Sequence, residues 1–305
     1  MNEKAPGLTI ITPTYNRKKL LKKCFASLLH QTCYDFEWIV IDDGSSDGTR
    51  DEFPELLKAD LPFPVYYMWK ENGGKHTALN ASHSYVHGKY ILLLDSDDIL
   101  LNNAVATVLN GWKEYEGNPD IGMVIFLKQL ADGTIVAKAE KEKVAVDVLN
   151  NHRICNIAND CCEVIRADLF LKYPFPVFKG EKFLAETALW YRAGLEAKCI
   201  YINEPIYICE YLDEGLTKAG KKLRIKNCHG GMFTSYLRMN RRCSLQERVK
   251  AGMLYVCYGH FAKMNSMAIL KSASEYRGWL LLCLFPGRIL YRCWKKKYIN
   301  SSRGR

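Results

Sequence analysis

Two aspartates are separated by a single serine in the sequence Asp95-Ser96-Asp97, and both carboxylates could face one cleft. Carboxylate oxygens are hard ligands that suit Mg²⁺ or Mn²⁺ better than zinc. An ion held there could bridge the two phosphates of a nucleotide diphosphate and take up charge as that group leaves. The same spacing is also typical of turns and helix N-caps, so the surrounding sequence has to decide between a metal site and a cap.

The aspartates follow one of several short apolar segments that alternate with helical patterns. We predict strands at 8–13, 37–42, 65–69 and 90–94, with helices after Asn16, over 49–58 and over 76–86. The Asn16 side chain is expected to cap the first of these helices. Strands that alternate with helices in this way indicate a parallel sheet with helices on both faces.

Polar clusters follow three of these predicted strands, at 12–17, 42–47 and 95–98. Ligands of such sheets bind beyond the carboxyl ends of the strands, which lie together at one edge. The three clusters therefore predict a single site at that edge.

The second half of the chain has a looser pattern. We predict a helix over 103–115, a hairpin of 122–130 with 134–138, a helix over 181–195, strands at 199–202 and 206–209, and helices from 217 to the end. No internal repeat and no low-complexity linker interrupts the sequence.

The charge of the chain is unevenly distributed. Its 43 Lys and Arg against 33 Asp and Glu give a net charge of +10. Residues 218–305 hold 20 of the bases and two of the acids, so this region carries +18 and residues 1–217 carry −8. An acidic front and a basic back suggest two different tasks.

The sequence favours a cytoplasmic protein with free thiols. Its twelve cysteines form no C-x-x-C pair and no Cys/His cluster at the spacing of metal ligands. The first residues lack the apolar core of a signal peptide, and no apolar run reaches the roughly 18–20 residues that cross a bilayer.

Four linked motifs make the prediction specific. They are PTYNR at 13–17, IDDGSSDGT at 41–49, NGGK at 72–75 and LDSDD at 94–98. In order and spacing they resemble the family 2 glycosyltransferases, whose nucleotide-sugar transferase fold is called GT-A. Four motifs within about one hundred residues favour a binding site over a helix cap at the last of them.

The resemblance implies a fold and a domain division. The expected fold is α/β of the GT-A type, Rossmann-like, with a mostly parallel sheet, helices on both faces and a C-terminal helical extension. The GT-A domain would cover 1–217, with a nucleotide-binding half at 1–100 and an acceptor-binding half at 101–217. Residues 218–305 would form a separate basic helical region.

The resemblance also implies roles on the base side of a nucleotide donor. Pro13 and Tyr15 would line the base pocket, with the Tyr15 ring against a uracil. Asp43 would accept a hydrogen bond from the base.

On the phosphate side, the resemblance implies contacts to the diphosphate, the sugar and a metal. Lys75 would lie near the phosphates, Asp95 would contact the ribose or the sugar, and Ser96 would belong to the donor site. Asp97 would be the direct ligand of Mn²⁺ or Mg²⁺.

The acceptor side is implied by a segment similar to a bacterial capsule and surface-polysaccharide subgroup, in which Glu-Lys-Phe leads to a Glu and then a Trp. By that match Glu186 would be the general base for an acceptor hydroxyl. Trp190, one helical turn later, would pack on the acceptor sugar. Thr187 stands where many relatives have Asp after the glutamate, and Glu181 is the alternative base.

The implied activity is inverting, metal-dependent transfer of a sugar from a nucleotide-diphosphate donor, with UDP favoured, to a glycan in surface or capsular polysaccharide synthesis. A sugar nucleotidyltransferase is an alternative, but it would want a Gly-rich phosphate loop with a basic residue after the first strand, where this chain has 12–16, TPTYN. A second alternative is a non-catalytic binder of membrane or nucleic acid that retains the fold.

The basic C-terminal region suggests a partner. One helical face over 279–298 would carry Ile289, Leu290, Cys293, Trp294 and Tyr298, beside basic residues on another face. Such a helix suits an anionic membrane surface, which would also bring the enzyme to a glycan on a lipid carrier. An ordinary packed helix explains the pattern equally well, and nucleic acid ranks last because no recognition motif is present.

Overall fold

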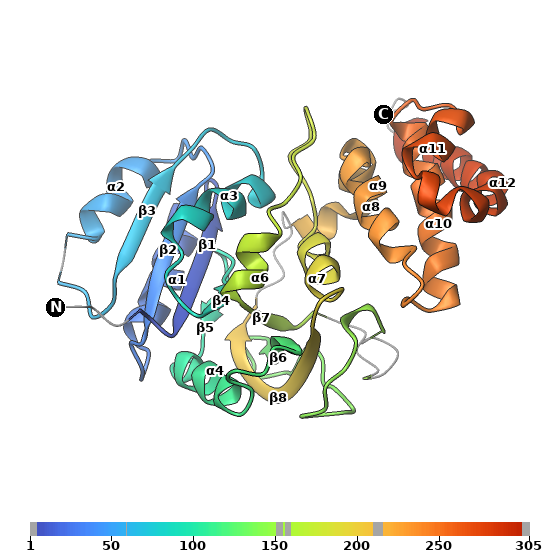
Figure 1. Ribbon diagram of the computed structural model, residues 1–305. Helices are drawn as coiled ribbons and strands as arrows, with labels where there is room; N and C mark the ends of the chain where they lie inside the picture. Colours follow the sequence, from blue (N-terminus) through green and yellow to red (C-terminus); the bar gives the residue numbers. More distant parts are fainter. Residues whose placement is uncertain (1–4, 59, 151–154, 156–159, 210–215, 301–305) are drawn as a thin grey trace. The chain divides into compact units, whose positions relative to one another are not determined.

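The computed structural model describes residues 5–58, 60–150, 155, 160–209 and 216–300 (Figure 1). Contacts divide the chain into two compact units. The first combines Met1–Phe175 with Ala193–Glu210, and the second combines Pro176–Arg192 with Tyr211–Arg305. The segment 176–192, which the sequence analysis assigns to the first domain, groups with the C-terminal helices.

A mixed sheet forms the centre of the first unit (Figure 1). In the described residues it has eight strands in the order β3-β2-β1-β4-β7-β6-β8-β5. The strands are β1 (Leu8–Thr14), β2 (Phe36–Asp42), β3 (Val65–Trp69), β4 (Tyr90–Leu93), β5 (Ile99–Leu100), β6 (Ile121–Gln129), β7 (Cys162–Arg166) and β8 (Lys198–Ile208). β1 to β4 pair in parallel, β7 runs antiparallel to β4 and β6, and β8 runs parallel to β6 and antiparallel to β5.

Helices cover both faces of the parallel part, as the sequence predicts. The helices of this unit are α1 (Lys18–Leu29), α2 (Thr49–Leu56), α3 (Lys75–Ala81), α4 (Ala104–Lys113) and α6 (Ala167–Lys172), with short 3₁₀ turns η1 (Ser82–Tyr85) and η2 (Val148–Asn150). α1, α2 and α4 share one apolar core with Ile10 and Val40 of the sheet. Alternation along the strands turns Ile11 and Ile39 to the opposite face, and α3 contacts β1 and β2. All seven residues of β1 and of β2 are buried, which is typical of parallel strands covered on both sides.

A buried carboxylate ties the amino ends of three neighbouring strands together. Glu37 of β2 is only 1% exposed. Its Oε1 accepts from the Thr9 hydroxyl at 2.5 Å and from the N–H groups of His87 and Gly88 at 2.6 and 3.1 Å, while His87 Nδ1 lies 2.8 Å from Oε2. One charged side chain thus joins β1, β2 and the turn that leads into β4.

The second unit is helical, as predicted beyond residue 217. Its elements are α7 (Thr187–Ala193), α8 (Leu216–Lys226), α9 (Cys228–Arg238), α10 (Leu245–Phe261), α11 (Ser266–Ser272), η3 (Ser274–Tyr276), α12 (Arg277–Trp294) and a final π turn, η4 (Lys295–Ile299). A separate apolar core around Met239, Val256 and Leu280 holds these helices together. In the described residues, no helix has both the length and the apolar content that crossing a bilayer requires.

The turn after β1 corrects one prediction, because Asn16 does not cap α1. Its φ of 53° is left-handed, and its side-chain oxygen accepts from the Ser46 N–H at 2.7 Å. The N-cap position is held by Arg17, and the Lys18 N–H is bound by Asp47 Oδ2 at 2.9 Å. The acceptor for the first turn of α1 therefore comes from the neighbouring loop, which a local sequence pattern does not reveal.

The predicted hairpin after β6 is confirmed at its turn but is shorter than predicted. The N–H groups of Leu130 and Val136 donate to the carbonyls of Thr134 and Lys128 at 2.8 and 2.9 Å. Gln129 and Ile135 form an isolated antiparallel bridge, and 134–138 forms no full strand. The two strands predicted around residues 200 and 207 form the single strand β8.

The helix predicted over 181–195 is shorter in the structure. It begins at Thr187, because the residues before it pack against the start of α9. The N–H groups of Lys182 and Phe183 donate to Asn227 Oδ1 at 2.9 and 3.1 Å. These tertiary bonds replace the first predicted helical turns.

The apolar face predicted for the last helix is mostly inside the unit. Leu290 and Tyr298 pack against the second core, and Trp294 is only 9% exposed within it. The face of α12 that is exposed carries Leu281, Leu282, Phe285 and Ile289. The sequence is apolar around nearly the whole helix at 279–285, and packing of Leu280 and Cys283 decides which side turns inward.

We expect Glu37→Ala to lower the free energy of unfolding by about 3 kcal/mol, because buried donors lose a charged acceptor. Urea denaturation followed by circular dichroism measures the change. The matched control is Glu116→Ala, which removes a pair with Lys89 whose two side chains are more than half exposed and should cost about 0–1 kcal/mol. Equal effects of the two substitutions would contradict the structural role of Glu37.

Candidate active site at the carboxyl ends of the strands

The turn after β4 carries three aspartates. Carboxylate oxygens of Asp95, Asp97 and Asp98 lie within 4.8 Å of one another. The Asp98 N–H donates to the Asp95 carbonyl at 3.0 Å, and Ser96 within the turn is buried. A donor set made of carboxylates fits Mg²⁺ or Mn²⁺, so the residues at this turn fit the ion that the sequence predicts. Asp98 extends the predicted pair of aspartates to a group of three.

Two cations from other parts of the first unit pair with these aspartates. Arg17, at the start of α1, forms an ion pair with Asp97, and Lys75, at the start of α3, forms one with Asp95. Burial would raise the pKa of the Asp95 carboxyl, but Lys75, with Lys128 and Arg17, outweighs burial and holds that pKa below its ordinary value. The structure thus brings Lys75 to the acidic turn, and it adds Arg17, whose role the sequence did not predict.

Two residues that the sequence analysis did not predict, Tyr207 and Lys128, support the acidic turn after β4. The Asp95 N–H donates to the hydroxyl of the fully buried Tyr207 of β8 at 2.9 Å. The ammonium of Lys128, at the end of β6, lies 4.6 Å from the centre of the Tyr207 ring and 2.9 Å from Asp160 Oδ2. Burial would lower the pKa of Lys128, but Asp160 and other nearby anions raise it well above its ordinary value. Neither Tyr207 nor Lys128 stands in a short motif, so sequence spacing carried no signal for them.

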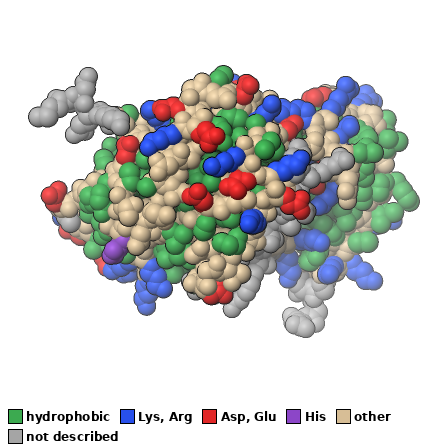
Figure 2. Space-filling model, turned by 90° about the horizontal axis from the view of Figure 1, so that it is seen from below, with side chains coloured by type: hydrophobic (Ala, Val, Ile, Leu, Met, Phe, Trp, Pro, Cys, Tyr) green, Lys and Arg blue, Asp and Glu red, His purple; other side chains and the backbone are tan. Residues whose placement is uncertain are grey.

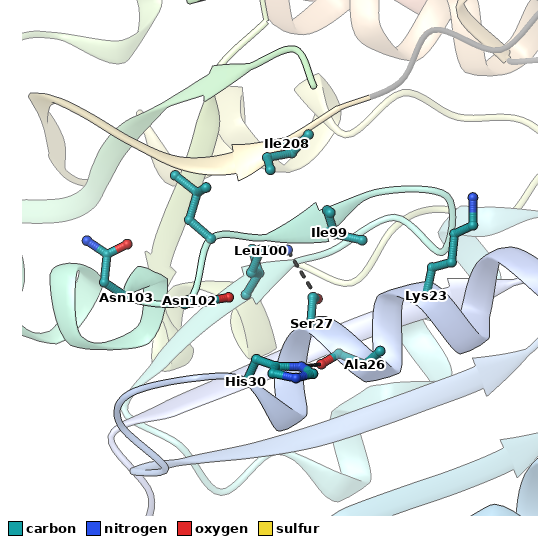
Figure 3. Close-up of a pocket in the computed structure, with 10 residues that line it drawn as sticks. Lys23, Ala26, Ser27, His30, Ile99, Leu100, Asn102, Asn103 and Ile208 are labelled. Carbon is teal, nitrogen blue, oxygen red and sulfur yellow. Dashed lines mark hydrogen bonds between the residues drawn. The ribbon is translucent and has the colours of Figure 1, made fainter. Parts of the chain in front are cut away.

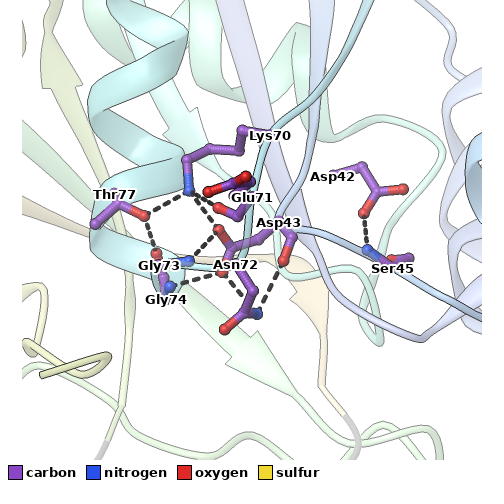
Figure 4. Close-up of polar contacts among 9 residues, drawn as sticks. All are labelled: Asp42, Asp43, Ser45, Lys70, Glu71, Asn72, Gly73, Gly74 and Thr77. Carbon is purple, nitrogen blue, oxygen red and sulfur yellow. Dashed lines mark hydrogen bonds and ion pairs between the residues drawn. The ribbon is translucent and has the colours of Figure 1, made fainter. Parts of the chain in front are cut away.

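Asp43, after β2, anchors the loop that leads into α3 (Figure 4). Its oxygens accept from Lys70 Nζ at 2.6 Å, Gly74 N–H at 2.7 Å, Gly73 N–H at 3.0 Å and Asn72 Nδ2 at 3.2 Å. A carboxylate has about four lone-pair positions, so the chain itself supplies a donor for each. A nucleotide base would have to share or replace one of these donors, and base recognition by Asp43 stays a prediction.

The two residues predicted for the base pocket differ in accessibility. Pro13 is buried within β1, opposite Ile41 of β2. Tyr15, just beyond the end of β1, exposes 49% of its surface. A half-exposed ring at the carboxyl edge of the sheet is available for stacking, whereas Pro13 shapes the strand beneath it.

In the second unit, Glu181 has a structural role. It is 8% exposed and lies at the start of α9. Oε1 accepts from the His229 N–H at 2.8 Å and lies 2.8 Å from His229 Nδ1, while Oε2 accepts from the Gly230 N–H at 2.9 Å. An anion that receives the first N–H groups of a helix also interacts favourably with the helix dipole.

Glu186 and Trp190, the predicted base and acceptor platform, lie in the same unit as Glu181. Glu186 is partly exposed and immediately precedes α7. Its carbonyl accepts from the N–H groups of Leu189 and Trp190, and Trp190 is also partly exposed. Of the two candidate bases, Glu181 is therefore the one whose carboxylate accepts the first N–H groups of α9.

A surface hollow of the first unit lies between α1 and β5 (Figure 3). Lys23, Ser27 and His30 line it from α1, and residues 99–103 with Ile208 line it from the sheet side. The predicted donor-binding residues are absent from this lining in the described part of the chain. The hollow therefore gives no support to the predicted site, which rests on the acidic turn.

Comparisons with known proteins find similarity to glycosyltransferases. Residues 9–125 match the family model described as glycosyl transferase family 2. Glycosyltransferase GlyG of Streptococcus pneumoniae serotype 4 is 26% identical over 213 residues, 66% of this chain and 69% of that protein. A GalNAc(5)-diNAcBac-PP-undecaprenol beta-1,3-glucosyltransferase of Campylobacter jejuni is 36% identical over 108 residues, which are 34% of each protein. This second match thus spans about a third of its relative.

Solved structures share the fold. S. aureus TarS 1–349 in complex with UDP-GlcNAc has a TM-score of 0.64 at 16% identity, covering 96% of this chain and 92% of that chain. Mannosyltransferase PcManGT from Pyrobaculum calidifontis, in complex with GDP-Man and Mn²⁺, has a TM-score of 0.60 at 16% identity, covering 96% and 89%. The α/β fold and the C-terminal helices expected from the sequence are thereby confirmed.

We expect Glu181→Gln to lower the midpoint of thermal unfolding by about 2–8 °C, because an amide leaves a buried N–H without an acceptor. Lys179→Gln, which changes an exposed side chain of the same segment, is the matched control and should shift the midpoint by about 1 °C or less. Differential scanning calorimetry of the two variants beside the unchanged protein tests this difference. An equal loss with Lys179→Gln would contradict the structural role of Glu181.

Proposed function

We propose that the chain transfers a sugar from a nucleotide-diphosphate donor to a hydroxyl of a glycan, because its residues 9–125 match the family model of glycosyl transferase family 2. The observation that carries the proposal is the acidic turn after β4, where the carboxylates of Asp95, Asp97 and Asp98 gather at the carboxyl edge of the sheet. Sheets of this kind bind ligands at that edge, beyond the ends of their strands.

The proposed donor is a UDP-sugar. TarS, a protein of the same fold, binds UDP-GlcNAc. The exposed ring of Tyr15 would stack on the uracil above Pro13, while Asp43 would share its carboxylate with the base N–H. Lys75 would turn from Asp95 toward the phosphates, and Asp95 and Ser96 would face the ribose or the sugar.

Mg²⁺ or Mn²⁺ would be held by Asp97, with Asp95 and Asp98 beside it. A bound divalent ion stabilises negative charge on a departing diphosphate without a proton transfer. The neighbouring fold of PcManGT was solved with Mn²⁺ and GDP-Man. Tyr207 and Lys128 would keep the aspartate turn in place from beneath, through the bond to the Asp95 N–H and the packing on the Tyr207 ring.

Glu186 would accept the proton of the acceptor hydroxyl. The acceptor oxygen then forms a bond to the anomeric carbon as the bond from that carbon to the diphosphate breaks, which inverts the anomeric configuration. Trp190 would pack on the acceptor sugar. Glu181 is not proposed as the base, because its oxygens already bind the start of α9.

The proposed acceptor is a surface polysaccharide precursor, and a lipid-linked glycan is its natural form. The Campylobacter jejuni relative is named for a glycan on undecaprenyl diphosphate. A sugar carried by such a lipid is presented at a membrane surface, so the enzyme would have to work there.

We further propose that α12 contacts an anionic membrane surface. Leu281, Leu282, Phe285 and Ile289 form a stripe along its exposed side, with exposed fractions of 54%, 74%, 77% and 46%. Exposed bases follow on the same helix and its extension, including Arg288, Arg292 and Lys296. In Figure 2 hydrophobic side chains lie beside Lys and Arg on this unit. The apolar side chains can insert into the membrane interface, and each nearby cation adds about 1 kcal/mol of attraction to anionic lipid.

For the reaction, we expect Asp97→Ala and Glu186→Gln each to lower the rate of sugar transfer by about 100-fold or more, through different steps. Glu186→Gln should still bind UDP with Mn²⁺, as judged by thermal shift, because only the proton acceptor is lost. Asp97→Ala should lose that Mn²⁺-dependent shift. A panel of UDP- and GDP-sugars, scored by donor hydrolysis, identifies the donor, and full activity of Asp97→Ala would overturn the metal mechanism.

For the membrane, we expect the double variant Leu282→Glu/Phe285→Glu to reduce binding to vesicles rich in phosphatidylglycerol by tenfold or more. Cosedimentation with vesicles measures it, and phosphatidylcholine vesicles should bind weakly throughout. The matched control is Leu245→Glu, a 65% exposed leucine at the start of α10 that should have little effect. Unchanged binding of the double variant, or no binding of the unchanged protein to either kind of vesicle, would refute a lipid partner.

A further inference from the structure

The ion pair between Arg17 and Asp97 has a consequence for how the proposed donor and metal bind. Asp97 is the carboxylate that the proposed metal needs, and in the structure it is in contact with a guanidinium. Both side chains are largely shielded, with 25% of Arg17 and 15% of Asp97 exposed. A guanidinium and a divalent ion repel each other and compete for the same oxygens.

The backbone of Arg17 is fixed on both sides, so its side chain starts from a defined place. The Asn16 N–H donates to Ser45 Oγ at 2.9 Å, and the Asn16 side chain accepts from the Ser46 N–H at 2.7 Å. The Lys18 N–H donates to Asp47 Oδ2 at 2.9 Å. The loop after β2 thus clamps the residues before and after Arg17, which leaves only its side chain to rearrange.

We propose that Arg17 is an internal counterion that occupies Asp97 until the metal enters, and that it then transfers to the diphosphate of the donor. This inference rests on the proposed function, because it needs a metal and a nucleotide at the same turn. A displaced guanidinium requires a new anion, and phosphate oxygens accept it in a bidentate geometry. Metal and nucleotide therefore assist each other's binding, and the metal alone binds weakly.

Lys75 makes the corresponding pair with Asp95, but the two cations are not equivalent. Lys75 begins α3 behind the loop that Asp43 anchors, and its partner is the aspartate proposed for the sugar side. Arg17 pairs with the proposed metal ligand itself. We therefore assign the competition with the metal to Arg17. Removing the charge of Arg17 should raise the affinity for the metal, whereas a loss of structure would lower it.

The test measures Mn²⁺ affinity directly, by the electron paramagnetic resonance signal of free Mn²⁺, with and without UDP. In Arg17→Gln we expect Mn²⁺ alone to bind about tenfold more tightly, because its competitor is gone. UDP should then improve Mn²⁺ binding by a smaller factor than in the unchanged protein. Arg17→Lys keeps a cation beside Asp97, so Mn²⁺ alone should bind it about as weakly as it binds the unchanged protein. Lys19→Gln, an exposed charge on α1, controls for the net charge.

The outcomes distinguish a failure of the counterion role of Arg17 from a failure of the proposed function. If the unchanged protein binds Mn²⁺ with UDP but Arg17→Gln binds Mn²⁺ alone no more tightly, the counterion role is wrong and the site stands. If the unchanged protein binds no Mn²⁺ even with UDP, the proposed metal site is wrong as well. A thermal melt of each variant establishes that it is folded, and tighter Mn²⁺ binding could not arise from a misfolded site.

Discussion

Negative charge concentrated at one edge of the sheet is the constraint on which the first unit depends. The strands β1, β2 and β4 are parallel, so their carboxyl ends place aspartates from two loops at the same edge of the sheet. Such a group of carboxylates is stable only if nearby cations and N–H groups balance it. Asp43 therefore pairs with Lys70 and accepts from the N–H groups of Gly73 and Gly74. The aspartates after β4 pair with Lys75 and Arg17. The shape of the loops follows from that balance.

Much of this edge could be predicted from the sequence because its signals are local. A parallel strand buried on both faces is a short apolar run, and the predicted strands 8–13 and 37–42 match β1 and β2 to within one residue. The supports of the edge could not be predicted, since they depend on pairing across long distances in the chain. Tyr207 reaches the Asp95 N–H from 112 residues away, on a strand whose position only the sheet order decides. The predicted capping of α1 by Asn16 is wrong for a similar reason, because the Asn16 side chain binds Ser46 in another loop.

Two features that the sequence leaves open depend on packing against a distant helix. Glu181 and Glu186 both lie within the helix predicted over 181–195, and in the structure the N–H groups of residues 229–230 bind Glu181. The last helix is apolar on more than one side, and no periodicity could tell that Trp294 turns to the core while Phe285 stays exposed. In both cases the decisive partner belongs to a different helix.

The interleaving of the two units limits how this protein can be divided. The chain passes from one unit to the other after Phe175, returns after Arg192, and passes over again between 209 and 216. The segment 176–192 carries Glu186, and its N–H groups and Glu181 are bound by Asn227 and the start of α9. No single cut separates the first unit from the second. An exchange of the C-terminal helices between relatives, by recombination or in the laboratory, would have to carry this internal segment with them.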